Sequence, residues 1–415
     1  MKQEKHTKRN IIIGITTITI LTASIITFAK ANFRTTESIP LVNGTINYDL
    51  ADSNLVGVYI NSDSGYTKTD TVPESGYILN EEESYCTVNG ERDTNIKLSY
   101  DVDTKSLSVT PMTTQGTKCY LYFDEYTPSY TMSEIIAGYN KGTRSNFGSA
   151  YTTSHTKQVF TTTDWAGTSY YFAGAPTDNW VSFGGFYWRI IRVNGDGSVR
   201  LLYNGTTTET TGSGTLTKTS QAFNSSYNRS EYVGLKYTSG EQHGQNTNST
   251  ILTELNSWYT SSNLDDHASH IDTNIGFCSD RNMKSGSSWS SQPSSGIYYA
   301  AYGRIVDNQN PSLACSSNDI IKVPVGLITA DEAMFGGVPW SGNATGNYLI
   351  NGQYYWTMSP SYYYGSAIVF AVNSSGYLSN GWVYSASGVR PVINLKADTK
   401  FEGSGTPDSP FEIAT

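Results

Sequence analysis

The feature that most constrains this fold is an apolar run that a glycine-rich turn divides in two. Residues 181–193 are rich in Val, Phe, Trp and Ile, and residues 194–197 then read Asn-Gly-Asp-Gly. A second apolar run, residues 198–203, follows the turn. Asn-Gly and Asp-Gly steps favour the tight turns that connect antiparallel strands. The sequence therefore predicts a β-hairpin in the core of a folded unit that begins near Trp165.

Two helices are predicted within the same unit, which gives it an α+β fold. Between residues 248 and 264, apolar side chains recur on one face of a helix, with Ser249 or Thr250 as the expected N-cap. Residues 328–337 predict a short capped helix that ends at glycine. Long Ser-, Thr-, Gly- and Asn-rich insertions, which are usually surface loops or partly disordered segments, occupy residues 204–248 and 280–300.

The rest of the chain predicts a second, smaller folded unit. Before residue 128, short alternating runs divided by turn signals predict a small all-β module, for which a sandwich is the expected arrangement. The predicted organisation is therefore a signal peptide or N-terminal membrane anchor at 1–31, an all-β spacer at 38–127, a linker at 128–163, the α+β domain at 164–400 and a tail at 401–415.

The N-terminus has the pattern of an export signal. Four basic residues lie within the first nine positions, residues 11–28 are uncharged, and Ala29-Lys30-Ala31 fits the small-x-small rule for signal peptidase. The uncharged stretch is also close to the length that spans a bilayer, so either cleavage or anchoring fits. In both cases the remainder is expected to be extracellular, secreted or anchored to the cell surface.

Four cysteines form two local pairs. Cys86 and Cys119 are separated by 33 positions, and Cys278 and Cys315 by 37. In an oxidising compartment each pair is expected to form one disulfide. Free thiols or a zinc site are the alternatives, although the chain has no Cys-x-x-Cys and no His at ligand spacing.

Composition excludes one class of partner. The net charge is -9, only 15% of residues are charged, and no Lys/Arg cluster follows the N-terminus. Nucleic-acid binding needs a basic surface that displaces counterions. We therefore expect no nucleic-acid partner, and a membrane contact only through the possible N-terminal anchor.

The segment from residue 354 to 395 carries the predicted function. Apolar residues alternate with Tyr, Ser, Asn and Gly, a mixture that suits a half-buried sheet with a binding face. Three consecutive tyrosines, Tyr362 to Tyr364, cannot all point inward from one strand. Plain packing of a sheet that favours tyrosine is the alternative.

Three motifs resemble the C-type lectin fold in its formylglycine-generating-enzyme-like subtype. They are residues 186–189 (Phe-Tyr-Trp-Arg), 356–360 (Trp-Thr-Met-Ser-Pro) and 388–392 (Gly-Val-Arg-Pro-Val). Similar domains occur in exported proteins of Gram-positive gut bacteria and in the variable proteins of diversity-generating retroelements. The resemblance implies a ligand-binding face formed by Tyr362, Tyr363, Tyr364, Ser366, Tyr377, Ser379, Asn380, Trp382, Tyr384 and Ser385.

The resemblance has limits that bear on function. The catalytic cysteines of the formylglycine-generating enzyme have no counterpart here, and the Glu-Pro-Asn or Gln-Pro-Asp triplets of calcium-dependent lectins are missing. His267 and His270 beside two aspartates are expected to form a solvated turn, and Arg390 to be held by a buried carboxylate or, alternatively, to anchor ligand. No metal, cofactor or catalytic residue is predicted.

The expected function is recognition at the cell surface by an adhesin or receptor, without enzymatic activity. The partner would be a protein or glycan on a host or bacterial surface, and the binding face would be fixed or diversified by a retroelement. A structural surface protein and a secreted polymer-degrading hydrolase remain as alternatives. No Gly-x-Ser-x-Gly, His-Glu-x-x-His or phosphate-binding glycine motif supports the hydrolase.

Overall fold

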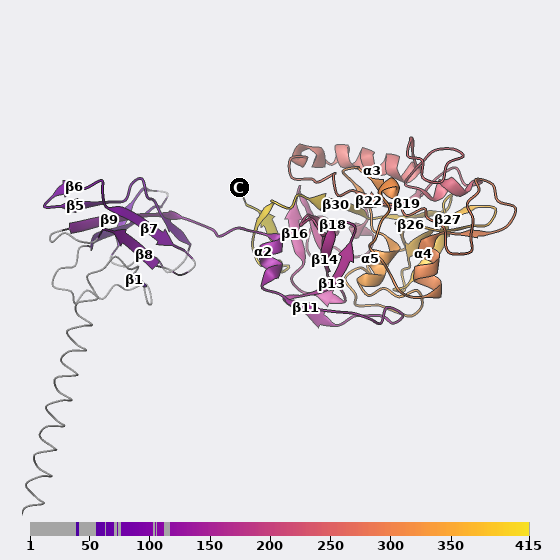
Figure 1. The fold of residues 1–415 in the computed structure, drawn as a ribbon, viewed down its shortest axis with the longest axis horizontal. Coiled ribbons are helices and arrows are strands. Elements are labelled where there is room, and N and C mark those ends of the chain that lie inside the picture. Colours follow the sequence, from indigo (N-terminus) through magenta and orange to yellow (C-terminus); the bar gives the residue numbers. More distant parts are fainter. Residues whose placement is uncertain are drawn as a thin grey trace, which may run out of the picture. The chain divides into compact units, whose positions relative to one another are not determined.

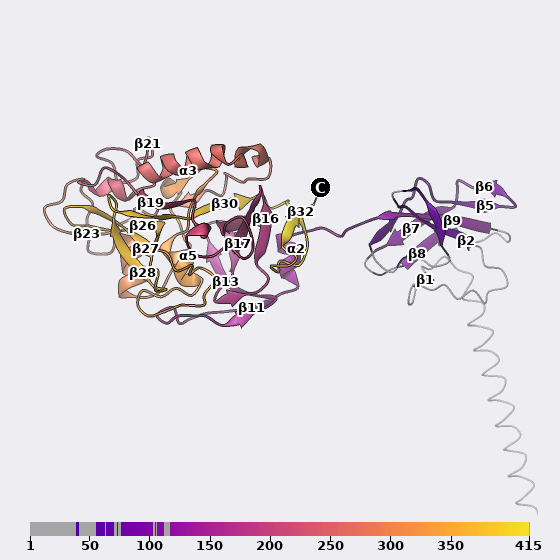
Figure 2. The same ribbon diagram turned by 180° about the vertical axis from the view of Figure 1, so that it is seen from behind.

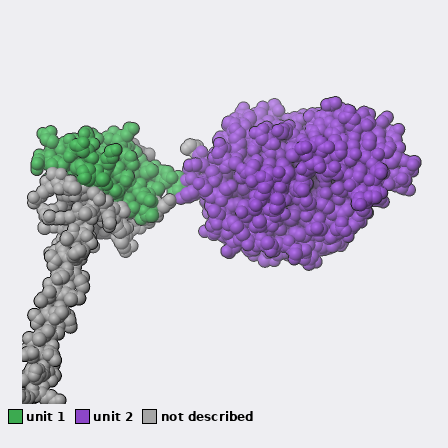
Figure 3. All heavy atoms as spheres, viewed as in Figure 1, with its two compact units in different colours: residues 1–128 green, residues 129–415 purple. Residues whose placement is uncertain are grey.

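A computed structural model describes residues 39–40, 55–62, 64–69, 73, 76–102, 104, 106–111 and 117–414. The chain divides into two units, residues 1–128 and 129–415 (Figures 1 and 3). The predicted signal or anchor lies outside the described residues. Within the described part, no helix is long and apolar enough to cross a membrane.

Every regular element described in the first unit is a strand. β8 pairs with β1 on one side and with β7 on the other, while β9 lies at the centre of a second sheet with β2, β4 and β5 as neighbours. The strands are β1 (Ile39–Pro40), β2 (Leu55–Ile60), β3 (Thr67–Thr69), β4 (Tyr77–Leu79), β5 (Tyr85–Val88), β6 (Glu91–Arg92), β7 (Lys97–Asp101), β8 (Ser106–Thr110) and β9 (Thr117–Glu125).

A small core joins the two sheets of this unit. Leu121 and Phe123 of β9 are fully buried, and Leu98 of β7 belongs to the same apolar cluster. Cys86 and Cys119 lie directly opposite each other on β5 and β9 and form a disulfide. The predicted pairing of these two cysteines is confirmed.

The second unit is built on two sheets that share one core. The larger sheet contains β10 (Tyr130–Thr131), β11 (Asn140–Gly142), β13 (Gln158–Asp164), β14 (Gly167–Tyr171), β16 (Trp180–Phe183), β17 (Phe186–Val193), β18 (Val199–Tyr203), β25 (Gly326–Leu327), β30 (Pro391–Leu395), β31 (Lys400–Glu402) and β32 (Phe411–Ile413). The smaller sheet contains β19 (Lys218–Ala222), β23 (Ile297–Tyr298), β26 (Tyr355–Tyr363), β27 (Ala367–Val372), β28 (Leu378–Trp382) and β29 (Ala386–Val389).

Short elements connect and cover these sheets. Three two-stranded ladders are β12 (Ser154–His155) with β15 (Ala175–Pro176), β20 (Lys236–Tyr237) with β21 (Thr247–Asn248), and β22 (Phe277–Cys278) with β24 (Ile320–Ile321). The helices are α2 (Met132–Ala137), α3 (Thr250–Ser261), α4 (Ala300–Tyr302) and α5 (Ala330–Phe335), and the shorter turns of helix are η1 (Gly212–Thr215), η2 (Ser230–Val233), η3 (Leu264–His267), η4 (Gly303–Asp307) and η5 (Ser317–Asp319). Figures 1 and 2 show α3 along one side of this unit.

The predicted hairpin is confirmed, with one correction to its first strand. β17 pairs antiparallel with β18 around the Asn-Gly-Asp-Gly turn. The run 181–193 is not one strand, because Gly184 and Gly185 both adopt positive φ and reverse the chain between β16 and β17. Glycine adopts this conformation without a steric penalty, so the turn occurs there.

The predicted linker and tail belong to the second unit. In residues 128–163, β10 and β13 join the larger sheet, and α2 follows β10 directly. In residues 401–415, β32 pairs in parallel with β16. Both segments are polar, and most of their strands are short, so the sequence shows no clear strand pattern there. Their backbone hydrogen bonds nevertheless extend the larger sheet. The domain is therefore larger than the predicted range of 164–400.

Both predicted helices form, with shorter bounds. α3 is capped by Ser249, whose hydroxyl accepts a hydrogen bond from the Leu252 amide at 3.3 Å. α5 begins after Thr329 and ends at Gly336, and Thr329 and Glu332 form a reciprocal capping box. α5 packs against β26 and β27, so it lies where the smaller sheet meets the core.

A buried ionic network connects α5 to the larger sheet. The Glu332 carboxylate lies 3.0 Å from Arg192 Nε of β17 and 2.7 Å from Arg200 Nη1 of β18, and Arg192 also pairs with Asp164 at 2.6 Å. Burial by itself would raise the pKa of Glu332, but the two guanidinium groups and the Thr329 amide hold that pKa at about 2. Glu332 therefore stays ionised and fixes α5 to the hairpin.

Replacement of Glu332 should destabilise the second unit strongly. In Glu332→Gln the capping hydrogen bonds can persist, but Arg192 and Arg200 lose their shared counter-charge, which typically costs about 3–5 kcal/mol for a buried pair. Urea unfolding followed by tryptophan fluorescence measures this change. Glu134→Gln is the matched control, because Glu134 occupies the same capping-box position of α2 on the surface. An equal loss in both variants would contradict the role of the network.

The contribution of Glu332 should depend on acid pH. Its folded pKa lies below the ordinary value of 4.5, so the stabilisation is fully present above pH 4.5 and is lost as the pH falls towards 2. The difference in unfolding free energy between the wild type and Glu332→Gln should therefore shrink over this interval. A difference that stays constant from neutral pH to pH 2 would contradict the low pKa.

Loss of the first disulfide should destabilise the first unit alone. Removing a closed loop of this length costs about 3–4 kcal/mol in the chain-entropy model, which is a large share for so small a core. All eight tryptophans follow residue 128, so tryptophan fluorescence reports on the second unit only. In Cys86→Ser/Cys119→Ser, far-UV circular dichroism should show an early transition that tryptophan fluorescence does not. Cys278→Ser/Cys315→Ser, the matched control, should shift the tryptophan transition instead.

Candidate functional site

The candidate site is a cavity at the end of the smaller sheet. Its volume is about 380 Å³, within the range of small-molecule sites. Ile368 of β27 lies opposite Tyr362 of β26 on one side and opposite Trp382 of β28 on the other. The cavity is lined by Tyr354, Trp356, Tyr362, Ile368, Asn380, Gly381, Trp382, Ser385, Ala386 and Ser387. Strand register thus places one aromatic side chain, Tyr362 or Trp382, on each side of Ile368.

Trp382 forms one aromatic wall. Its side chain is 53% exposed, and its ring is parallel to that of Tyr384, with 6.0 Å between centroids. Tyr384 in turn packs edge-on against Tyr227 at 4.9 Å. Tyr384 contacts the indole but is not part of the cavity lining. Ring contacts of this kind restrict Trp382 before any ligand arrives.

Tyr362 forms a second wall, with its own support. Its ring lies 5.7 Å from Tyr298 of β23 and 5.8 Å from Tyr302 of α4. Lys284 Nζ lies 5.4 Å from both of these outer rings and forms an ion pair with Asp307. Partial burial raises the pKa of Tyr362, and the neighbouring tyrosines add to the effect. The Tyr362 hydroxyl is therefore neutral and can both donate and accept a hydrogen bond.

The floor of the cavity depends on a glycine. Trp356 is fully buried and donates from Nε1 to the Gln221 carbonyl at 2.7 Å. A Cβ atom at Gly381 would lie 2.4 Å from the Trp356 ring, so only glycine allows the indole to pack beneath β28. The position of the Trp356 ring therefore requires glycine at residue 381.

Polar groups occupy the side of the cavity next to Asn380. The Ser361 hydroxyl donates to Asn380 Oδ1 at 2.7 Å, and the Tyr354 hydroxyl bonds to the Asn380 carbonyl at 3.2 Å and also to Ser379 Oγ. Burial raises the pKa of Tyr354. These bonds orient the amide, whose Nδ2 has no partner among the described residues.

The structure brings four of the ten expected ligand residues together in the cavity: Tyr362, Asn380, Trp382 and Ser385. Tyr384 supports the cavity from outside, and Ser379 bonds to Tyr354. Tyr364 is 74% exposed but lies outside the lining, at the turn between β26 and β27 with Ser366. The ten residues therefore do not form one continuous face.

Two further expected ligand residues do not line the cavity. Tyr363 is only 6% exposed, because β26 pairs with β23 as well as β27, and its hydroxyl donates to the Asn228 carbonyl at 3.1 Å. Tyr377 closes the turn at the far end of the hairpin formed by β27 and β28, five residues before Trp382 at the end of β28. Neither side chain belongs to the cavity lining.

Sequence reasoning missed the residues that support the walls. Tyr227 and Tyr298 come from the two insertions that were expected to be surface loops or partly disordered. Both segments contain strands that pair with β29 or β26. The signal in the sequence was the presence of tyrosines among Ser, Thr and Gly, but only pairing with a distant strand brings these rings to the site.

Arg390 is structural, and its expected carboxylate partner is absent from the described contacts. The guanidinium is completely buried and donates to the Tyr203 and Leu349 carbonyls and to Asn204 Oδ1, at 2.7–3.0 Å. Burial lowers the pKa of Arg390. Three neutral acceptors thus replace the carboxylate, and the side chain cannot reach a ligand. His267 and His270 pack against Phe183.

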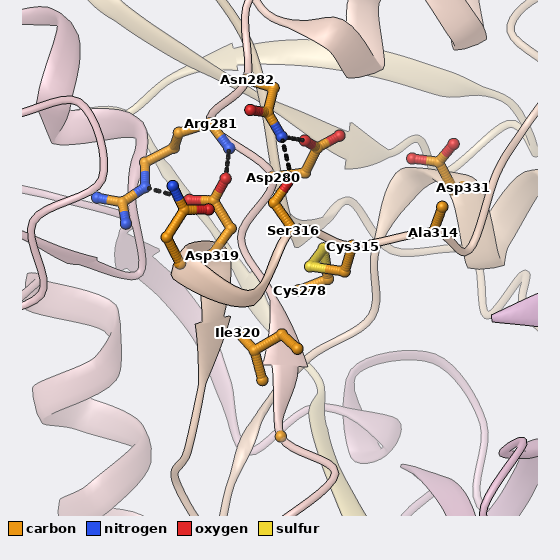
Figure 4. Close-up of a disulfide and its surroundings, with 12 residues drawn as sticks. Cys278, Asp280, Arg281, Asn282, Ala314, Cys315, Ser316, Asp319, Ile320 and Asp331 are labelled. Carbon is orange, nitrogen blue, oxygen red and sulfur yellow. Dashed lines mark hydrogen bonds and ion pairs between the residues drawn. A yellow bond between two sulfur atoms is a disulfide. The ribbon is translucent and has the colours of Figure 1, made fainter. Parts of the chain in front are cut away.

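A second hollow lies beside the Cys278–Cys315 disulfide. The confirmed disulfide is close to Asp280 and to the Arg281–Asp319 pair (Figure 4). Asp280 pairs with Arg304 at 2.6 Å. The hollow measures about 20 Å³, which is space for about one water molecule. Three arginines and three carboxylates line it, so their charges balance. This region holds the fold together and leaves no room for an organic ligand.

Comparison with family models, curated proteins and solved structures finds no match for this chain.

A methyl group at Gly381 should disturb the cavity floor. Gly381→Ala places its Cβ against the Trp356 ring, and overpacking of this kind costs about 1–3 kcal/mol. Thermal unfolding measures the loss, and the fluorescence of Trp356 should change with it. Gly138→Ala is the matched control, because the atom nearest its added Cβ is 3.7 Å away. If both variants unfold at the same temperature as the wild type, the claim that only glycine fits against the Trp356 ring is contradicted.

Proposed function

We propose that this protein is an extracellular ligand-binding protein whose second unit recognises its partner at the cavity between Tyr362 and Trp382. The observation that carries the proposal is the pair of aromatic walls, each held by further tyrosines. Rigid aromatic side chains in a recess supply large contact area at little entropic cost, as at binding hot spots. An adhesin and a diversified receptor would both bind through this surface.

The chemistry of the lining favours binding over catalysis. The ten lining residues include no carboxylate, histidine, cysteine or lysine. General acid and base catalysis needs such groups within hydrogen-bonding reach of the substrate. The two serines of the lining therefore have no base beside them, and the proposal assigns no reaction to this cavity.

Location and fold are part of the same proposal. Two disulfides suit an oxidising, extracellular compartment, in agreement with the export signal in the sequence. The C-type lectin-like fold is supported by its three motifs, which lie in β17, in β26 and across β29 and β30. The motif at residues 356–360 and the first part of the motif at residues 388–392 thus lie in β26 and β29, two strands of the sheet that carries the cavity.

Truncation of Trp382 should remove most of the binding. Loss of an anchor of this type costs about 2 kcal/mol or more, roughly a 30-fold weaker affinity. The full-length chain, fluorescently labelled, would be titrated onto intact bacterial and epithelial cells and measured by flow cytometry. Trp382→Ala should lose the saturable binding, while Tyr364→Ser, a change at a more exposed aromatic outside the cavity, should keep it.

Two results would contradict the proposed function. One is the absence of saturable binding to any cell surface by the wild type. The other is equal binding by the wild type and Trp382→Ala, with the fold of the variant verified by circular dichroism.

A further inference from the structure

We infer that the cavity accepts an uncharged saccharide, one or two pyranose rings of a larger glycan. This inference rests on the proposed function and adds the chemical class of the ligand. It follows from how apolar and polar groups are divided within the lining, from the absence of charge there, and from the size of the space.

The indole of Trp382 is the most exposed aromatic ring of the lining, with 53% of the residue accessible. Its ring is parallel to that of Tyr384, which is not part of the lining. A pyranose has a face of C–H groups that stacks on an aromatic ring. Tyr227 contacts the ring of Tyr384 and thereby helps to hold the ring beside the indole in place.

Three side chains of the lining carry hydrogen-bonding groups that have no partner within the described residues. Among the described residues, the Tyr362 hydroxyl, the Ser385 hydroxyl and Asn380 Nδ2 have no protein partner, although all three residues line the cavity. The hydroxyl groups at the edge of a sugar ring both donate and accept hydrogen bonds, so they can pair with all three. An inserted apolar side chain of a protein would bury these groups without partners, which is unfavourable.

The absence of charge excludes two other ligand classes. No lysine or arginine lines the cavity, so an acidic sugar or a phosphate would find no counter-charge in a chain of net charge -9. No carboxylate lines it either, and Trp356 is fully buried, so a quaternary ammonium would meet an incomplete aromatic cage. A neutral ligand with hydroxyl groups fits both observations.

The volume of the cavity limits how many sugar residues of a glycan it can hold. A volume of about 380 Å³ is near the lower end of the range for ligand sites. It therefore holds a terminal residue or a pair of residues, and the rest of the glycan would extend past the rim at Tyr384 and Tyr227. Among the described residues, no group of three or more His, Cys, Asp or Glu side chains is placed to hold a metal ion.

The test uses the full-length chain on an array of neutral, sialylated and sulfated glycans, followed by calorimetry with the best neutral oligosaccharide in buffer containing EDTA. The wild type should bind neutral glycans in EDTA. Trp382→Ala should weaken binding at least 10-fold, Trp382→Phe should retain most of it because a ring remains, and Asn380→Ala should weaken it without loss of fold. Tyr364→Ser, outside the cavity, should bind like the wild type.

The outcomes separate this inference from the proposed function. Binding only to acidic glycans, binding to choline chloride in place of sugars, or neutral-glycan binding that Trp382→Ala does not alter would overturn the saccharide assignment. Absence of glycan binding together with Trp382-dependent attachment to cells whose glycans have been removed enzymatically would also overturn it, and would leave the proposed function standing. Loss of both kinds of binding would remove the proposed function as well.

Discussion

The fold of the second unit depends on the carboxylate of Glu332, which joins α5 to the hairpin of β17 and β18, whose arginines lie 132 and 140 positions away in the sequence. It closes the N-terminal cap of α5 and accepts hydrogen bonds from Arg192 of β17 and Arg200 of β18. Arg200 also bonds to Asn394 of β30. Because α5 packs against β26 and β27, this carboxylate fixes the smaller sheet, and with it the cavity, relative to the larger one.

The molecule separates its charged and uncharged polar chemistry. The interior of the second unit contains arginines paired with carboxylates or, for Arg189 and Arg390, with neutral acceptors. The cavity instead contains rings, hydroxyls and one amide. Buried charges make a framework rigid when every partner is present, whereas uncharged groups near the surface remain available to a ligand. The two arrangements serve stability and recognition separately.

The walls of the cavity are assembled by the pairing of separate strands, not by one contiguous segment. Trp382 and Tyr362 come from the smaller sheet, and their supports come from insertions that add β19 and β23 to it. The insertions therefore act as a frame around the cavity. Since each wall has its own support, a change in one insertion would alter one wall and leave the other in place.

The sequence by itself determined the local features. Cysteine spacing predicted both disulfides, the Asn-Gly-Asp-Gly turn predicted the hairpin, and Ser249 was one of two expected caps of α3. Each depends on residues close together along the chain, where turn and cap chemistry act directly. The sequence also pointed to Trp382 and Asn380 among the ligand residues, through composition and resemblance.

Only the tertiary structure decided which of those residues form a site. Whether Tyr362 or Tyr363 faces the cavity depends on the bulged pairing of β26 with β27 and on the added strand β23. The supports Tyr227 and Tyr298, the linker that became part of the larger sheet, and the neutral partners of Arg390 likewise arise from contacts between distant segments. Strand register and burial are properties of the assembled sheets, so the order of residues alone does not specify them.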